Sequence, residues 1–149
     1  MLDDSGDPAF KDECGIQEAY NAPDGVALHG DTLYISGTRS IGDVLDDAYI
    51  PFKAVHKTQR YQQALAALKK GKGRVAQVFG HSLGGAVAAR LIEERPDLVA
   101  RVCGAPLYRD NASSRVTSYR HFRDPISFLD KGAQVSTASG WNPHSYKGY

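Results

Sequence analysis

Few features of this chain point to a membrane, a nucleic acid or a disulfide scaffold. Among 149 residues there are only two cysteines, too few for a disulfide framework, and Cys103 in its apolar stretch is interpreted as a small core residue. The formal net charge of +1 gives no general attraction to nucleic acids or anionic membranes. No apolar run is long enough to span a membrane, and the acidic N-terminus lacks the basic and apolar regions of a secretory signal. We therefore expect a soluble protein that is cytoplasmic or exported by another route.

Composition and length are typical of one globular domain. Apolar residues make up 42% of the chain and charged residues 23%. Residues 1–24 are rich in Asp, Gly and Pro and have no apolar periodicity, which predicts a flexible N-terminal lead segment. Residues 25–149 are predicted to form a single α/β domain.

Strand and helix patterns alternate along this domain. Apolar residues alternate on both sides of Gly30-Asp31, as in a β-hairpin, and Gly71 and Pro96 follow two segments with helical apolar spacing. The predicted elements are a hairpin over residues 26–37, helices over 54–70 and 83–95, and strands over 75–80, 99–106 and 116–122. This alternation predicts a mostly parallel sheet with helices on both faces and any chemistry at the carboxyl ends of its strands.

The segment Gly80-His81-Ser82-Leu83-Gly84 joins a predicted strand to a predicted helix. A Gly-x-Ser-x-Gly sequence in that place is typical of the nucleophile elbow, a tight turn that lifts a serine hydroxyl above the sheet edge. Side chains at the two glycines would collide with the neighbouring strand and helix. The helix N-terminus also favours developing negative charge beside Ser82. Ser82 is therefore the predicted nucleophile, and the alternative is a glycine-rich turn with an incidental serine.

A serine nucleophile needs a general base and an acid that orients the base. In α/β-hydrolases the acid and then the histidine follow the serine along the chain. Asp124 stands directly after a predicted strand and before a proline, and His144 lies after every candidate acid. We predict Asp124 as the orienting acid and His144 as the base, although His144 has the alternative of being an ordinary surface residue. The candidates passed over are His29, His56, His81, His121, Asp97, Asp110 and Asp130.

Two backbone N–H groups are expected to bind the oxyanion of the tetrahedral intermediate. One belongs to Leu83, the residue after the nucleophile, and the other comes from a loop after an earlier strand. That loop is residues 37–40 here, and we predict the N–H of Thr38 as the second donor. The loss of one such donor typically raises the barrier by about 3 kcal/mol.

Two charged segments have ordinary explanations. Residues 41–51 have the pattern of a short amphipathic helix with apolar positions at Ile41, Val44, Leu45 and Ala48. Its three aspartates lack the further ligands of a metal site, so a solvated face is predicted. The basic segment 69–74 lacks the spacing of a phosphate-binding loop and precedes a strand, so a solvated connector is predicted.

Together these segments resemble the class 3 lipase family, the fungal triacylglycerol lipase-like branch of the α/β-hydrolases, in an unusually short form. The matching blocks, in the family's order, are Ile35-Ser36-Gly37-Thr38-Arg39-Ser40-Ile41, Gly80-His81-Ser82-Leu83-Gly84-Gly85-Ala86, Cys103-Gly104-Ala105-Pro106, and Asp124-Pro125-Ile126 leading to His144. The resemblance implies a minimal α/β-hydrolase fold, a triad of Ser82, Asp124 and His144, and an oxyanion donor at Thr38. It also implies that residues 41–51 are a lid over the acyl site, for which a fixed packing helix is the alternative. The family often has an arginine where this chain has Ser36.

The predicted activity is that of a serine carboxylic-ester hydrolase, a lipase or esterase, which forms an acyl-enzyme and needs no metal or organic cofactor. Its expected partner is a lipid or another acyl ester, with transient contact with a lipid surface when the lid opens. The alternatives are a phospholipase or acyltransferase that uses the same triad, or a hydrolase-like domain that binds or assembles without catalysis.

Overall fold

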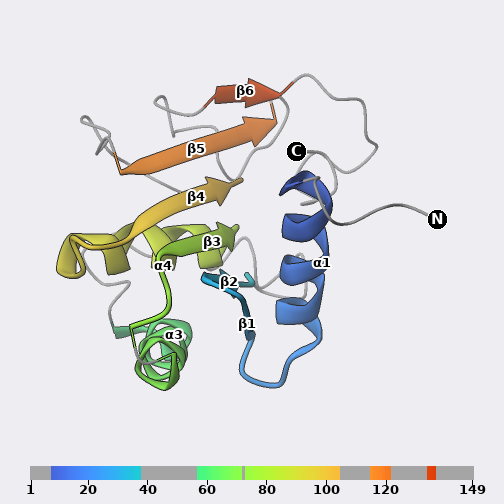
Figure 1. Ribbon diagram of the computed structural model, residues 1–149. Helices are drawn as coiled ribbons and strands as arrows, with labels where there is room; N and C mark the ends of the chain where they lie inside the picture. Colours follow the sequence, from blue (N-terminus) through green and yellow to red (C-terminus); the bar gives the residue numbers. More distant parts are fainter. Residues whose placement is uncertain (1–7, 38–56, 72, 105–114, 122–133, 137–149) are drawn as a thin grey trace.

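Six strands form one sheet, and their order across the sheet follows their order in the sequence (Figure 1). The computed structural model describes residues 8–37, 57–71, 73–104, 115–121 and 134–136. The strands are β1 (Val26–His29), β2 (Thr32–Ile35), β3 (Gln77–His81), β4 (Val99–Cys103), β5 (Val116–His121) and β6 (Gln134–Ser136). β1 runs antiparallel to β2, and each later strand is parallel to the one before it. The predicted α/β class with a mostly parallel sheet is confirmed.

The first two strands form the predicted hairpin. His29 pairs with Thr32 across a two-residue turn, Gly30-Asp31. Gly30 has a φ of +56°, whereas Asp31 is not among the residues with a positive φ. A positive φ at the first turn residue alone is the pattern of a type II′ turn, whose twist suits a hairpin. After the hairpin turn, β2 pairs in parallel with β3 and so belongs to the parallel part of the sheet.

Helices α3 (Gln59–Lys70) and α4 (Leu83–Glu94) cover one face of the sheet (Figure 1). Each helix is the crossover that a pair of parallel strands requires, α3 between β2 and β3 and α4 between β3 and β4. Alternate strand positions point into this layer, so Leu33 and Ile35 of β2 pack with the helices while Tyr34 faces the other way. The core contains Leu33, Ile35, Ala64, Leu68, Val78, Val87, Leu91, Ile92, Leu98 and Val102, all buried.

The helix predicted over residues 54–70 begins later than predicted, at Gln59. Thr58 is its N-cap, with extended backbone at φ −74° and ψ 150°, and its side-chain oxygen accepts the N–H of Tyr61 at 3.2 Å. Gly71 ends the helix, as predicted. The helix predicted over 83–95 ends at Glu94, and no sequence signal predicted the three-residue strand β6. A strand of that length is too short for apolar alternation to mark it.

The prediction of a flexible lead segment over residues 1–24 is wrong for residues 8–21. These residues form helix α1 (Pro8–Asn21), which packs on the opposite face of the sheet from α3 and α4 (Figure 1). Ile16 and Ala19 are buried there. The helix is hard to recognise because Gly15 lowers helix propensity in its interior. That glycine is needed for packing, since a β-carbon at Gly15 would lie 2.4 Å from the ring of Tyr34.

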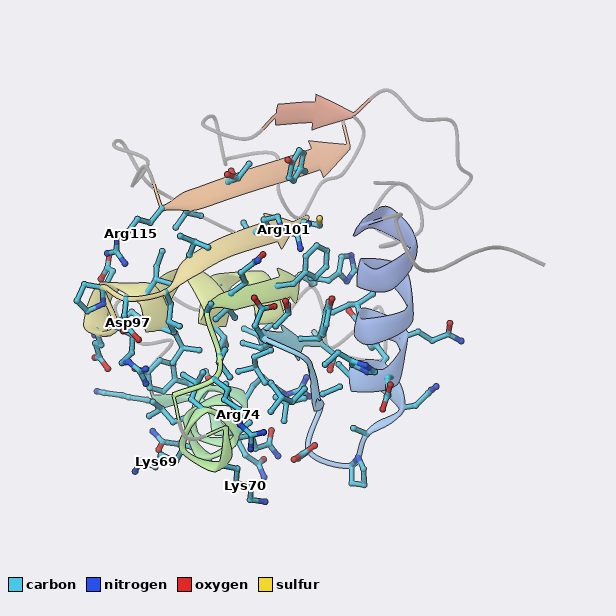
Figure 2. All side chains as sticks on the ribbon, viewed as in Figure 1. Lys69, Lys70, Arg74, Asp97, Arg101 and Arg115 are labelled. Carbon is cyan, nitrogen blue, oxygen red and sulfur yellow. The ribbon has the colours of Figure 1, made fainter. Side chains whose placement is uncertain are left out.

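None of the helices in the described part of the chain is long and apolar enough to cross a membrane. In the basic segment 69–74, Lys69 and Lys70 are the last residues of α3 rather than part of a connector. These two lysines and Arg74 are exposed to solvent, as predicted, and their side chains project outward around the end of α3 (Figure 2).

Candidate active site

The turn between β3 and α4 holds Ser82 in a backbone conformation that side chains rarely adopt. Its φ is 58° and its ψ is −126°, and no other non-glycine residue within the described ranges has a positive φ. These angles mirror those of the first central residue of a type II turn, about −60° and +120°. Such strained residues cluster at functional sites. The sequence predicts a tight strand-to-helix turn at Ser82, and the structure shows one.

Backbone hydrogen bonds hold the turn on both sides. The N–H of Ser82 donates to the carbonyl of Cys103 at 2.9 Å, which ties the end of β3 to the end of β4. The carbonyl of Ser82 accepts the N–H groups of Gly85 at 2.9 Å and Ala86 at 3.3 Å, the first bonds of α4. Ser82 is thus the N-cap of α4, and it is buried, with 2% of its surface exposed.

Both motif glycines occupy positions with no room for a side chain. A β-carbon at Gly80 would lie 2.2 Å from the carbonyl oxygen of Gly84. One at Gly84 would lie 2.1 Å from the carbonyl oxygen of Ile35 in β2. Each contact is with backbone, which cannot swing aside as a side chain can. The glycines therefore let the first turn of α4 lie directly on β3 and β2.

The end of β2 lies against the candidate nucleophile. A β-carbon at Gly37 would be 2.7 Å from the β-carbon of Ser82 and 3.1 Å from the hydroxyl oxygen of Tyr20. Only glycine leaves space for this approach. The chain therefore leaves β2 directly beside Ser82. Residues 38–40, the rest of the predicted oxyanion loop, lie outside the described residues.

Tyr20 of α1 is a site residue that sequence reasoning missed. Its hydroxyl hydrogen-bonds to Nδ1 of His81 at 2.6 Å, and the two rings meet edge to face with centroids 5.8 Å apart. The hydroxyl oxygen of Tyr20 and the β-carbon of Ser82 both lie within about 3 Å of the position that a β-carbon at Gly37 would occupy. The apolar spacing of Ile16, Ala19 and Tyr20 is the one signal that could have revealed this helical face.

Leu83 is the first residue of α4. N–H groups in the first turn of a helix have no acceptor within the helix, and they lie at the positive end of its dipole. The helix itself therefore does not use the Leu83 N–H, and the local field favours an anion beside Ser82. This arrangement is suited to stabilising a negatively charged tetrahedral intermediate.

The remaining predicted site residues lie outside the described residues. They are Thr38, Asp124, His144 and the lid positions Ile41, Val44, Leu45 and Ala48. In the sequence, Asp124 follows the last residue of β5 by three positions, and His144 follows the last residue of β6 by eight. Within the described ranges, no group of three or more His, Cys, Asp or Glu side chains is arranged to hold a metal ion.

No protein-family model matches the chain, and no curated protein is significantly similar to it.

Proposed function

We propose that this protein is a serine hydrolase that cleaves carboxylic esters through an acyl-enzyme on Ser82. The observation that carries the proposal is the conformation of Ser82, at φ 58° and ψ −126° between a buried strand and a helix N-terminus. A structural serine gains nothing from such strain, which costs on the order of 1–3 kcal/mol. A nucleophile gains a hydroxyl held at the carboxyl edge of the sheet and a positive field from α4.

The topology supports Asp124 and His144 as partners of Ser82. The register aligns the last residues of β3 and β4, His81 and Cys103, with Tyr119 in the second half of β5 and with Gln134, the first residue of β6. Segments leaving β5 and β6 therefore start at the edge where Ser82 lies. β5 is two strand spacings from β3, roughly 10 Å, and three extended residues span about the same distance. A carboxylate three residues beyond β5 is within reach of a histidine beside Ser82.

In the proposed reaction, Oγ of Ser82 attacks the ester carbonyl carbon while His144 takes the hydroxyl proton and Asp124 stabilises the resulting imidazolium. The N–H groups of Leu83 and Thr38 bind the oxyanion. The intermediate collapses, His144 protonates the departing alcohol, and an acyl-Ser82 ester remains. Water, activated by the same histidine, then releases the carboxylic acid.

The proposed substrates are lipids or other acyl esters, on the strength of the sequence resemblance to class 3 lipases. Residues 41–51 are proposed as a lid whose apolar positions contact lipid when it opens. Activity that rises sharply once a short-chain triacylglycerol exceeds its solubility would support the lid. A smooth saturation curve through that limit would argue for a fixed helix.

The reaction is tested by hydrolysis of p-nitrophenyl butyrate by the wild type and by three variants, Ser82→Ala, His144→Ala and the double variant. We expect each single variant to lose almost all activity and the double variant to lose no more, because members of one triad act as a unit. Ser118→Ala is the control, since Ser118 is another buried serine, in β5. Wild-type turnover that persists in Ser82→Ala would refute the proposal.

A further inference from the structure

Arg60, in the first turn of α3, reaches across to the end of β2. Its Nη1 donates to the carbonyl oxygen and the hydroxyl oxygen of Ser36, each at 2.5 Å, and to the carbonyl oxygen of Gly37 at 3.2 Å. A longer contact of 3.5 Å joins the same nitrogen to the carbonyl of Gly25. One guanidinium thus binds two consecutive carbonyls where the chain turns from β2 towards Ser82.

The surroundings of Arg60 are built to hold it there. Gly25, at φ +74°, leaves the space, because a β-carbon at that position would lie 2.2 Å from Cζ of the guanidinium. Ser36 is buried, and both its N–H and its hydroxyl donate to the carbonyl of Gly25, at 3.0 and 2.9 Å. Nε of Arg60 donates to the side chain of Gln63 at 3.3 Å. Charge-assisted bonds of this kind are roughly twice as strong as neutral ones.

The position of Arg60 is not explained by the helix that carries it. A cation in the first turn lies at the positive end of the helix dipole, where it is disfavoured. The contacts of Nη1 with the carbonyls of Ser36 and Gly37 offset this cost and join the start of α3 to the end of β2.

The carbonyl of Gly37 shares a planar peptide group with the N–H of the next residue, and in a trans peptide the two point in opposite directions. Holding that carbonyl towards Arg60 therefore fixes the plane of the peptide group and directs its N–H away from Arg60. Gly37 itself lies against the β-carbon of Ser82. We propose that Arg60 is a positioning residue of the active site, which fixes the orientation of the peptide group that supplies the second oxyanion donor. The inference rests on the proposed serine hydrolase function.

The test compares steady-state hydrolysis of p-nitrophenyl butyrate by Arg60→Met and the wild type, with active enzyme counted by titration with a fluorophosphonate. Complete loss of an oxyanion donor lowers kcat by about 10²–10³, so a misoriented donor is expected to lower it by about 10- to 100-fold. KM should change by less than about twofold, because the oxyanion forms only after binding. Arg60→Lys keeps the charge, but its ammonium group ends short of the position of Nη1, so its kcat should fall between the two.

Two controls separate positioning from general loss of structure. Tyr61→Phe perturbs the same turn of α3 by removing the hydrogen bond from Tyr61 to Glu94, and Arg74→Met removes an exposed arginine elsewhere. Both should retain wild-type kcat per titrated site. A trifluoromethyl ketone, which forms a tetrahedral adduct with serine, should bind Arg60→Met more weakly by the factor lost in kcat. Butyrate, a planar product, should bind both enzymes equally.

The outcomes distinguish the two proposals. An active wild type with an Arg60→Met variant that keeps its kcat and its ketone affinity would overturn the role of Arg60 alone. A wild type that neither hydrolyses the ester nor reacts with the fluorophosphonate would overturn the hydrolase function, and the role of Arg60 with it. If Arg60→Met does not fold, the kcat of Arg60→Lys decides, and wild-type turnover by that variant would contradict positioning by Nη1 of Arg60.

Discussion

Replacing Ser82 with glycine should abolish catalysis and stabilise the fold. The backbone at Ser82, φ 58° and ψ −126°, is a region that glycine occupies without strain. A non-glycine residue there costs on the order of 1–3 kcal/mol, whereas glycine adds about 0.5–1 kcal/mol of backbone entropy to the unfolded chain. The difference favours glycine by about 1 kcal/mol. For a chain of this size that corresponds to a rise of about 2–4 °C in Tm.

The reference for this comparison is Ser82→Ala rather than the wild type, because both variants lack the hydroxyl and differ only in the β-carbon. Urea unfolding gives the free energy of unfolding of each, and equal m-values would show that the unfolded states are comparable. The control pair is Ser118→Gly and Ser118→Ala, since Ser118 lies in β5 and has no positive φ. At that position the glycine variant should be less stable than the alanine variant by about 0.5–1 kcal/mol. If Ser82→Gly were no more stable than Ser82→Ala, the strain at the nucleophile, and the reasoning built on it, would be wrong.

Two further substitutions test the packing around the site and between the helices. Gly84→Ala should lower the free energy of unfolding by about 3 kcal/mol, because its β-carbon would lie 2.1 Å from a backbone oxygen of β2. Gly30→Ala is the control: its β-carbon would lie in open space, so the strain at its positive φ should cost only about 1 kcal/mol in the same chemical denaturation assay. Equal losses in the two variants would contradict this account of Gly84. Burial, together with the hydrogen bond to Glu94, raises the pKa of Tyr61 to about 12. The folded state therefore favours the neutral phenol, so the wild type should be more stable than Tyr61→Phe below pH 10 and should lose that advantage as the pH rises from 10 to 12. A stability difference between the two proteins that stays constant from pH 10 to 12 would contradict the raised pKa, because it would mean that Tyr61 releases no proton on unfolding.

The sequence predicts the central part of the fold well because the signals there are local. Gly30-Asp31 specifies its turn and Gly71 ends α3, so each of these boundaries is determined by the chemistry of a few adjacent residues. The nucleophile turn is predictable for the same reason. Its glycines and its serine lie within five residues of one another.

The parts that escaped prediction depend on contacts between distant segments. Helix α1 is stabilised by a few residues such as Ile16, packed on the sheet, and it contains Gly15 because Tyr34 fills the space above it. Neither its apolar content nor its propensity marks it as a helix. The contact of Arg60 with Gly37 joins residues 23 positions apart, which no local pattern could reveal.

The nucleophile can be tested without knowing the substrate. The folded wild type, treated with a fluorophosphonate and digested, should carry a single phosphonyl group, and tandem mass spectrometry should locate it on Ser82. Ser118→Ala should be labelled as fully as the wild type, and Ser82→Ala should remain unmodified. Folded wild-type protein that stays unlabelled, or a label on any residue other than Ser82, would contradict the proposal that this strained serine is a catalytic nucleophile.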